Sequence, residues 1–474
     1  MTNFSTTAAS SDAKNPDAAH IPPSGWGQRI GDLRRSKFVK DAIGLTTGKG
    51  LNLVLGMLST LIFGIVFAKP EIAMISLFEM LVDLVMAFGV NWSAAGITRF
   101  GKDELHKKQS LAYTSSTRLY VLVPIVVTAV ILLLFFRTSV LDYLGAANPV
   151  LIWYLIGSLI VSLLHDQLTT MLATREKHFA NALFYVAQGV AKLVILATFL
   201  SGIIEPSAIG YVSALMWLNG LILLLRLPSC GSSFLYPMQR VRSEDLQAFV
   251  RYVVPQLYGV AGIYVVNWVD VYFIRKYGTL DALGAYQFLY SIFLKFAVFA
   301  FVANSILFPR IMAWKIENPD AIARFARKVP HLVLIVTILC SGLLLVLFPP
   351  LFDAFFGDKY VMGYVSFSLL ICSLPCYFIS YLFIPVLNSY DRVRYVQNIN
   401  ILSAICNLVV DYLLVPRFGI IGAALGTFVA YWVKAVLLMM PVHELFALRW
   451  RLILFLHIVL AGYVVFRFVA AVTL

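Results

Sequence analysis

Long apolar segments alternate with short polar connections along this chain from Phe38 to Leu474. A helix needs about 20 mainly apolar residues to cross the hydrocarbon core of a bilayer, and thirteen segments reach that length. The pattern predicts an all-α polytopic membrane protein of about 13 transmembrane helices, within a range of 12 to 14. We expect these helices at residues 39–68, 72–98, 117–136, 150–173, 180–202, 207–227, 248–274, 283–309, 328–349, 361–387, 395–415, 419–440 and 452–473.

Residues 1–37 contain no such apolar segment. Their first part is polar and rich in Ser, Ala, Asp and Pro, which predicts a disordered tail and not a signal peptide. Gly31–Lys37 adds a basic collar in front of the first helix. The spans account for most of the remaining chain, and hydrophobic residues make up 60% of the sequence, so we expect no separate soluble domain.

The basic residues are distributed unevenly between the two sides of the predicted membrane. Of the 37 Lys and Arg residues, 26 lie in the N-terminal segment and even-numbered connections, six in odd-numbered connections and five within spans. Connections rich in Lys and Arg stay on the cytoplasmic side, so the N-terminus is predicted to be cytoplasmic. The net charge of +13 is then explained by the membrane topology and by contact with anionic lipid, and it does not indicate a nucleic-acid partner.

Short sequence markers recur in the same order about 211 residues apart. Phe38-Val-Lys40 matches Phe249-Val-Arg251, Ala191-Lys-Leu-Val194 matches Cys406-Asn-Leu-Val409, and Glu205-Pro206 matches Val415-Pro416. A separation of six spans keeps both copies in the same orientation, so we expect two six-helix lobes in a parallel repeat around a central cavity. The predicted parts are a cytoplasmic tail (1–37), an N-lobe (38–227), a cytoplasmic linker (228–247), a C-lobe (248–440) and an extra C-terminal helix (441–474).

Lysines stand in the middle of several predicted spans, where a charge is costly and seldom lacks a function. Lys192 lies about 14 residues from the inner end of its span and continues a polar stripe that includes Gln188. Lys295 is equally central in the eighth span. We predict that these side chains line the cavity and bind an anionic substrate. The alternative is that each lysine pairs with an acid and locks two helices together.

Lys49 and Lys434 are further candidates for substrate binding. Lys49 lies about nine residues past Lys40, and Lys434 about seven residues from the inner end of the twelfth span. Both are close enough to an end that their long side chains could instead reach the membrane interface.

Three acidic residues are candidates for coupling transport to an ion. Glu79 and Asp83 are four residues apart on the second span and share one helix face. Two carboxylates held close together in a medium of low dielectric constant favour binding a proton or cation. Asp270 is the third candidate, and each of the three could instead partner a lysine. Asp411 is predicted to be an interface or cap residue, and His165-Asp166 to be interfacial.

Nothing in the sequence indicates a cofactor or metal centre. Cys372 and Cys376 are too few ligands for a metal and are read as small packing residues. The predicted outer connections are short, and no nucleophile or phosphate-binding motif is present. We therefore expect a protein that is not an enzyme.

Three regions of the C-terminal half carry a recognisable spacing of Gly, Pro, Asp and aromatic residues. The longest is Asn407-Leu-Val-Val-Asp-Tyr-Leu-Leu-Val-Pro-Arg-Phe-Gly419, which runs into Ile420-Ile-Gly-Ala-Ala-Leu-Gly-Thr427. The others are Asp270-Val-Tyr-Phe-Ile-Arg-Lys-Tyr-Gly278, with Leu283-Gly-Ala-Tyr286 beyond it, and Phe356-Gly-Asp-Lys-Tyr360. In this order they resemble polysaccharide flippases of the multidrug/oligosaccharidyl-lipid/polysaccharide exporter superfamily. Families of this kind usually carry 12 or 14 helices, so a thirteenth span departs from the pattern.

The resemblance implies a transporter that flips lipid-linked, polyprenyl-diphosphate oligosaccharide units across a bacterial inner membrane for surface polysaccharide (O-antigen or exopolysaccharide) synthesis. It also implies membrane lipids, a glycan polymerase and a chain-length regulator as partners, and a proton or sodium ion for coupling. Fixed cations inside the membrane suit a diphosphate, because they offset its lost hydration. Two alternatives remain open: a cation-coupled drug antiporter of the same superfamily, and a membrane glycan polymerase or acyltransferase.

Overall fold

The computed structural model describes residues 37–230 and 238–447, together with scattered residues between 455 and 469. Every regular element in this described part is helical, which confirms the predicted all-α fold. The long helices are α2 (Lys37–Val66), α3 (Lys69–Gly89), α5 (Ala112–Phe135), α7 (Val150–Thr174), α8 (His178–Leu200), α9 (Ala208–Arg226), α11 (Ser243–Tyr277), α12 (Leu280–Glu317), α13 (Pro319–Phe356), α14 (Tyr364–Ser389), α15 (Val393–Phe418) and α16 (Ile420–Phe446). Shorter elements are η1 (Asn91–Ser93), α4 (Ala94–Lys108), α6 (Arg137–Leu144), η2 (Leu227–Cys230) and η3 (Gly357–Gly363).

These helices are those of a multi-pass membrane protein. Ten helical segments of the described chain are long and apolar enough to cross a bilayer; one of them, Asp320–Ser389, takes in both α13 and α14, and Gly50–Val66 is a shorter apolar helix. The predicted span at 452–473 falls almost entirely outside the described residues. The predicted span at 72–98 is interrupted, because α3 ends at Gly89 and η1 follows, where Ser93 Oγ donates a hydrogen bond to the Val90 carbonyl.

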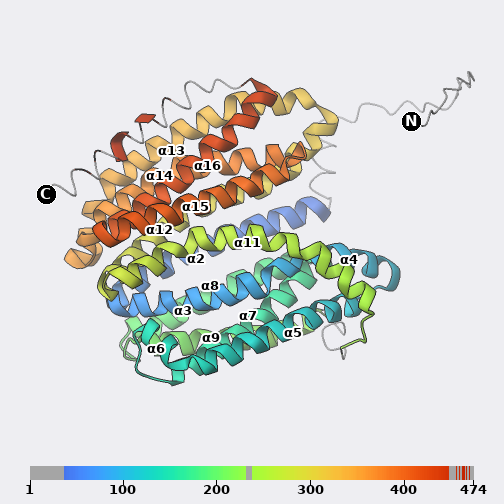
Figure 1. Cartoon of the computed structure of the whole chain (residues 1–474), viewed down its shortest axis with the longest axis horizontal. Coiled ribbons are helices and arrows are strands. Elements are labelled where there is room, and N and C mark those ends of the chain that lie inside the picture. Colours follow the sequence, from blue (N-terminus) through green and yellow to red (C-terminus); the bar gives the residue numbers. More distant parts are fainter. Residues whose placement is uncertain are drawn as a thin grey trace, which may run out of the picture.

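The described helices form two bundles, seen one above the other in Figure 1, and helices pack in the same order within each. The N-bundle contains α2 to α9, and the C-bundle contains α11 to α16. Equivalent pairs pack together in both: α2–α8 and α11–α15, α3–α7 and α12–α14, α5–α7 and α13–α14, α7–α9 and α14–α16, and α8–α9 and α15–α16. This correspondence is what a parallel repeat of six helices produces. The exact residue boundaries of the two lobes stay a prediction.

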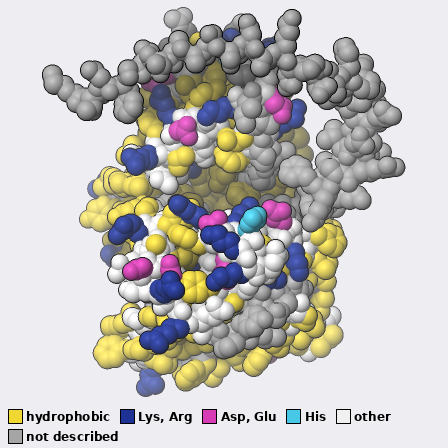
Figure 2. Space-filling view, turned by 90° about the vertical axis from the view of Figure 1, so that its right-hand side faces the viewer, with side chains coloured by type: hydrophobic (Ala, Val, Ile, Leu, Met, Phe, Trp, Pro, Cys, Tyr) yellow, Lys and Arg dark blue, Asp and Glu magenta, His cyan; other side chains and the backbone are white. Residues whose placement is uncertain are grey.

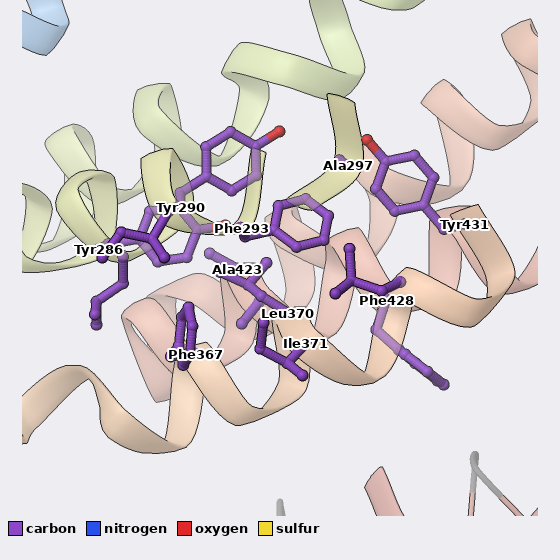
Figure 3. Close-up of a cluster of buried hydrophobic side chains, with 14 of the residues drawn as sticks. Tyr286, Tyr290, Phe293, Ala297, Phe367, Leu370, Ile371, Ala423, Phe428 and Tyr431 are labelled. Carbon is purple, nitrogen blue, oxygen red and sulfur yellow. The ribbon is translucent and has the colours of Figure 1, made fainter. Parts of the chain in front are cut away.

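The C-bundle is held together by a cluster of aromatic and small apolar side chains (Figure 3). Tyr286, Tyr290 and Phe293 project from α12 and are each at most 3% exposed. They meet Phe367 and Leu370 of α14 and residues of α16, all buried. These buried side chains give the C-bundle a continuous apolar core that joins α12, α14 and α16.

Helix α11 belongs to both bundles at once. Near its start, Phe249 and Val253 are buried against Trp92 of η1. Pro255 lies inside the helix, where a proline removes a backbone hydrogen bond and permits a bend. Beyond it, Asp270 is buried within the C-bundle. The helix therefore connects the two bundles by packing as well as by sequence.

Side chains close the molecule at the end that carries α6 and η3. Lys359 Nζ of η3 donates hydrogen bonds to the carbonyls of Gly64 (2.7 Å) and Phe67 (2.6 Å) at the end of α2. Tyr360 OH donates to the same Gly64 carbonyl, at 2.9 Å. Arg275 of α11 donates to the Tyr143 and Asp142 carbonyls of α6 at 2.7 and 2.8 Å. We call the contacts of Lys359 and Tyr360 with α2 the carbonyl latch.

The opposite end is rich in basic side chains. Figure 2 faces this end, which is at the right of Figure 1, and shows many Lys and Arg side chains on it with Asp and Glu among them. Helix α4 contributes Lys102, Lys107 and Lys108, all exposed. The distribution is the one expected if this end faces the cytoplasm.

We predict that residues at the two ends of the helices react from opposite sides of the membrane. In a variant whose native cysteines are replaced, Glu317→Cys should be modified by a membrane-impermeant maleimide only after cells are permeabilised. Asp358→Cys should react in intact cells, because η3 lies at the opposite end. Reaction of Glu317→Cys in intact cells would show that the topology is inverted.

Candidate functional site

A cavity of about 310 Å³ lies between the two bundles and contains both central lysines. Residues of α2, α3, α8 and α9 line it from the N-bundle, and residues of α11 and α12 from the other side. Lys192 and Lys295 both face it, together with Glu79 and Asp83. We call it the lysine cavity. The structure thus brings together four of the site residues that the sequence predicts.

The two lysines enter the cavity from different bundles. Lys192 of α8 lies beside the Tyr211 hydroxyl and within electrostatic range of Glu79. Lys295 of α12 reaches toward α2, where a Cβ placed on Gly56 would lie 3.3 Å from its Nζ. Lys192 and Lys295 are close enough to repel each other. Glu79 and Asp83 line the same cavity and formally balance these two charges, so the ammonium groups offer hydrogen-bond donors to an anion but no net positive charge.

Glu79 and Asp83 form the wall between the lysine cavity and a second one. This second cavity measures about 600 Å³ and lies inside the N-bundle among α3, α7, α8 and α9; we call it the N-bundle cavity. Both carboxylates line both cavities. Asp83 Oδ2 accepts a hydrogen bond from Trp268 Nε1 of α11 at 3.2 Å. The two carboxylates can therefore contact a ligand in either cavity.

Gln188 faces the N-bundle cavity and not the lysine cavity, although it shares a helix with Lys192. Its Nε2 donates to Asn219 Oδ1 at 3.1 Å. His165 and Asp166 also line this cavity, and their predicted interfacial depth stays a prediction. Asp166 is held by Arg118, which is fully buried, at 2.5 Å. Arg118 stands at the start of the predicted span 117–136, and only its tertiary partners show its role.

Asp270 is the centre of a buried polar cluster in the C-bundle. Its Oδ1 accepts a hydrogen bond from Asn407 Nδ2 at 3.0 Å, and its Oδ2 accepts from Thr427 Oγ1 at 2.6 Å and from the Tyr286 hydroxyl. Asp270 is 2% exposed, and Asn407 and Thr427 are fully buried. We call this group, with Asp411, the Asp270 cluster.

Asp411 lies in the same cluster, which makes the prediction of an interface or cap residue wrong. It is fully buried next to Asp270, and neither of its carboxylate oxygens has a hydrogen-bond partner in the described structure. Asn407 Oδ1 is also without a partner. Two carboxylates that close to each other need a proton or a cation between them. Carboxylate, amide and hydroxyl oxygens suit a hard cation, so the residues fit an ion or a proton.

Asn407, Asp411 and Thr427 were not chosen as site residues from the sequence. The repeat contained a signal for one of them, because it aligns Asn407 with Lys192 on the fifth helix of each half. Asp411 is one helical turn further along the same face. Its position near the end of α15, which stops at Phe418, did not reveal that its side chain faces Asp270.

The other two predicted lysines do not join the lysine cavity in the described structure. Lys434 lines a cavity of about 140 Å³ that adjoins the lysine cavity at Asn267 and Leu294, and its Nζ lies 5.7 Å from the Tyr381 ring. The backbone of Lys49 belongs to α2, but the structure does not describe its side chain.

Comparison with known proteins identifies the fold. No family model and no curated protein sequence matches this chain. The structure of lipid II flippase MurJ in an inward closed conformation has a TM-score of 0.70 and 14% identity, covering 91% of this chain and 93% of that one. An inward-facing multidrug resistance transporter of the MATE family and MOP superfamily has a TM-score of 0.63 and 13% identity, covering 83% and 95%. The Vibrio cholerae MATE transporter VcmN in its bent form has a TM-score of 0.53 and 16% identity, covering 85% and 98%. The chain therefore has the fold of MOP-superfamily transporters.

We predict that Gly426→Ala disrupts the Asp270 cluster. A Cβ at this position would lie 2.0 Å from Asp411 Oδ1, so the carboxylate must move away from its neighbours. Such overpacking destabilises a protein by about 1–3 kcal/mol, and the melting temperature of the purified protein should fall. Gly259→Ala in α11 is the matched control, because nothing lies within 4 Å of its Cβ position. Equal melting temperatures for the two variants would contradict the tight packing around Asp411.

Proposed function

We propose that this protein is a transporter that carries lipid-linked, polyprenyl-diphosphate oligosaccharides across a bacterial inner membrane by alternating access. The observation that carries the proposal is the lysine cavity, where Lys192 of one bundle and Lys295 of the other face a shared space. A diphosphate that leaves water loses most of its hydration, and two ammonium groups can replace it with charge-assisted hydrogen bonds. The fold of MOP-superfamily transporters supports this proposal, and MurJ among the similar structures is a lipid II flippase.

The carbonyl latch supports an alternating-access mechanism. The end with α6 and η3 is closed by Lys359, Tyr360 and Arg275, each of which binds backbone of the other bundle. Opening toward that side requires these hydrogen bonds to break. An anion that draws Lys192 and Lys295 together pulls on α8 and α12 at the same time, so substrate binding can drive the bundles past each other.

The Asp270 cluster gives the proposed transporter a place for a coupling cation. Asn267 and Trp268 line the lysine cavity, and Asp270 follows them within one turn of α11. Trp268 also donates to Asp83 of the N-bundle. A proton or sodium ion at Asp270 and Asp411 would fix the position of α11. A shift of α11 on ion binding would move Asn267 and Trp268 in the lysine cavity, and with Trp268 its hydrogen bond to Asp83.

A cation-coupled antiporter of cationic drugs is the second candidate. It is favoured by Glu79 and Asp83, whose carboxylates face the N-bundle cavity, and by the MATE transporters among the similar structures. The two functions need opposite charges at the binding site. Loss of the lysines abolishes flipping of an anionic lipid but leaves transport of a cation intact.

Removal of either central lysine should strongly reduce glycan export. Lys192→Ala and Lys295→Ala each leave the substrate anion without one partner in the interior, a loss of about 3–5 kcal/mol for a broken buried pair, so export should drop by at least about tenfold. Lys→Arg at the same positions should keep more activity, since the charge remains. Surface-glycan complementation in a flippase-deficient strain measures this effect.

Lys434→Ala should be milder, because Lys434 does not line the lysine cavity itself but a smaller cavity that adjoins it. Membrane protein levels are measured in parallel. Full export by the Lys192→Ala, Lys295→Ala double variant would remove the cationic-cavity mechanism, leaving the lysines as partners of Glu79 or Asp83.

Cation binding at the Asp270 cluster should stabilise the purified protein. A ligand at about 100 times its dissociation constant adds about 2.7 kcal/mol of stability, so raising either sodium or proton concentration should raise the melting temperature. Asp411→Asn removes one of the charges that hold the cation, and the response should disappear. Asp353→Asn, outside the cluster, should keep it. The coupling role is refuted if wild-type protein responds neither to sodium nor to pH in a way that depends on Asp411.

A further inference from the structure

The N-bundle cavity is larger than the lysine cavity that it adjoins, yet it has no part in the transport mechanism proposed above. The two cavities share Ile75, Glu79 and Asp83 as lining residues. Along α3, the lysine cavity begins at Ile72 and the N-bundle cavity ends at Met86, a distance of about 21 Å of helix rise. A single elongated molecule would have to pass beside Glu79 and Asp83 to occupy both.

The chemistry of the N-bundle cavity suits a polyhydroxylated ligand. Ser158, Ser162 and Thr169 present hydroxyls, and Tyr185 presents an aromatic ring. Gln188 and Asn219 bind each other through one amide atom each, so Gln188 keeps its carbonyl oxygen and Asn219 its NH₂ group for a ligand. Its volume of about 600 Å³ lies within the common range of about 300–1,000 Å³ for ligand sites.

The charges along the cavity walls further restrict which ligands can bind. Glu79 and Asp83 form no ion pair with any described Lys, Arg or His within 4.0 Å, whereas Asp166 is paired with Arg118. The N-bundle cavity thus meets the lysine cavity across two acidic side chains. A carboxylate on the ligand at this point would face like charges, which disfavours it.

We propose that the N-bundle cavity binds the sugar residues of the transported lipid and admits only sugars without an acidic group. This inference rests on the proposed flippase function, because it places the diphosphate at Lys192 and Lys295. The sugars then extend from the lysine cavity past Glu79 and Asp83 toward the predicted cytoplasmic end. Gln188 and Asn219 hydrogen-bond to sugar hydroxyls, and the two carboxylates exclude uronic acids.

The test measures binding of three soluble probes to the purified full-length protein in detergent. The probes are farnesyl diphosphate alone, farnesyl diphosphate carrying a glucose disaccharide, and the same compound with glucuronate as the second sugar. The glucose probe should bind at least about tenfold more tightly than the glucuronate probe, as expected where like charges meet. Glu79→Gln combined with Asp83→Asn should reduce that preference.

Variants of the cavity wall separate sugar binding from diphosphate binding. Gln188→Leu should weaken the glucose probe and leave farnesyl diphosphate unchanged, and Gln247→Leu, on the exposed start of α11, should change neither. Ser162→Val fills the cavity without removing a hydrogen bond seen in the structure, so it tests the same point if Gln188→Leu is unstable. Equal affinity for all three probes, or no effect of either wall variant on the glucose probe, would overturn the sugar site. Failure of farnesyl diphosphate itself to bind in a manner that depends on Lys192 and Lys295 would instead reject the flippase proposal and with it this site.

Discussion

A charge inside a membrane protein must regain from neighbouring groups the hydration that it lost, and this requirement organises the structure. Arg118 is fully buried because Asp166, Gln167 and Ser93 surround it, and these contacts tie α5 to α7 and to the end of α3. Asp270 similarly draws α12, α15 and α16 around α11 through three donors. The lysine cavity is different, because its two cations have fewer fixed partners and keep capacity for a ligand.

Equivalent positions in the two halves of the chain carry different side chains with different roles. The fifth helix of the N-bundle carries Lys192, and the fifth helix of the C-bundle carries Asn407 at the aligned position. A cation in the first half serves the lysine cavity, whereas an amide in the second half donates to Asp270. The packing order of the helices is unchanged, so the backbone of the repeat tolerates both.

Hydrophobic periodicity predicted the all-α fold and the order of the twelve described long helices, since span length is set by the thickness of the bilayer. It also identified Lys192, Lys295, Glu79 and Asp83, because charged residues stand out in an apolar helix. Hydrophobic periodicity did not predict contacts between residues that are far apart in the sequence. Asp411 and Asp166 looked peripheral from their distance to a helix end, yet Asp270 and Arg118, respectively, lie beside them inside the protein. Gln188 lines the N-bundle cavity and not the lysine cavity, although it lies one helical turn from Lys192 on the same polar stripe, and its predicted role in substrate binding stays a prediction.

The carbonyl latch has a consequence for the evolution of this fold. Lys359 and Tyr360 bind main-chain oxygens of α2, which every amino acid at those positions supplies. The turn of α2 is nevertheless restricted by its packing. A Cβ at Gly64 would lie 2.2 Å from the ring of Phe288, which stacks on Tyr360, so any larger residue there would displace the ring that supports the latch. Closure therefore limits substitution on both surfaces: through the space at Gly64 on α2, and through the hydrogen-bonding side chains of Lys359 and Tyr360 on η3.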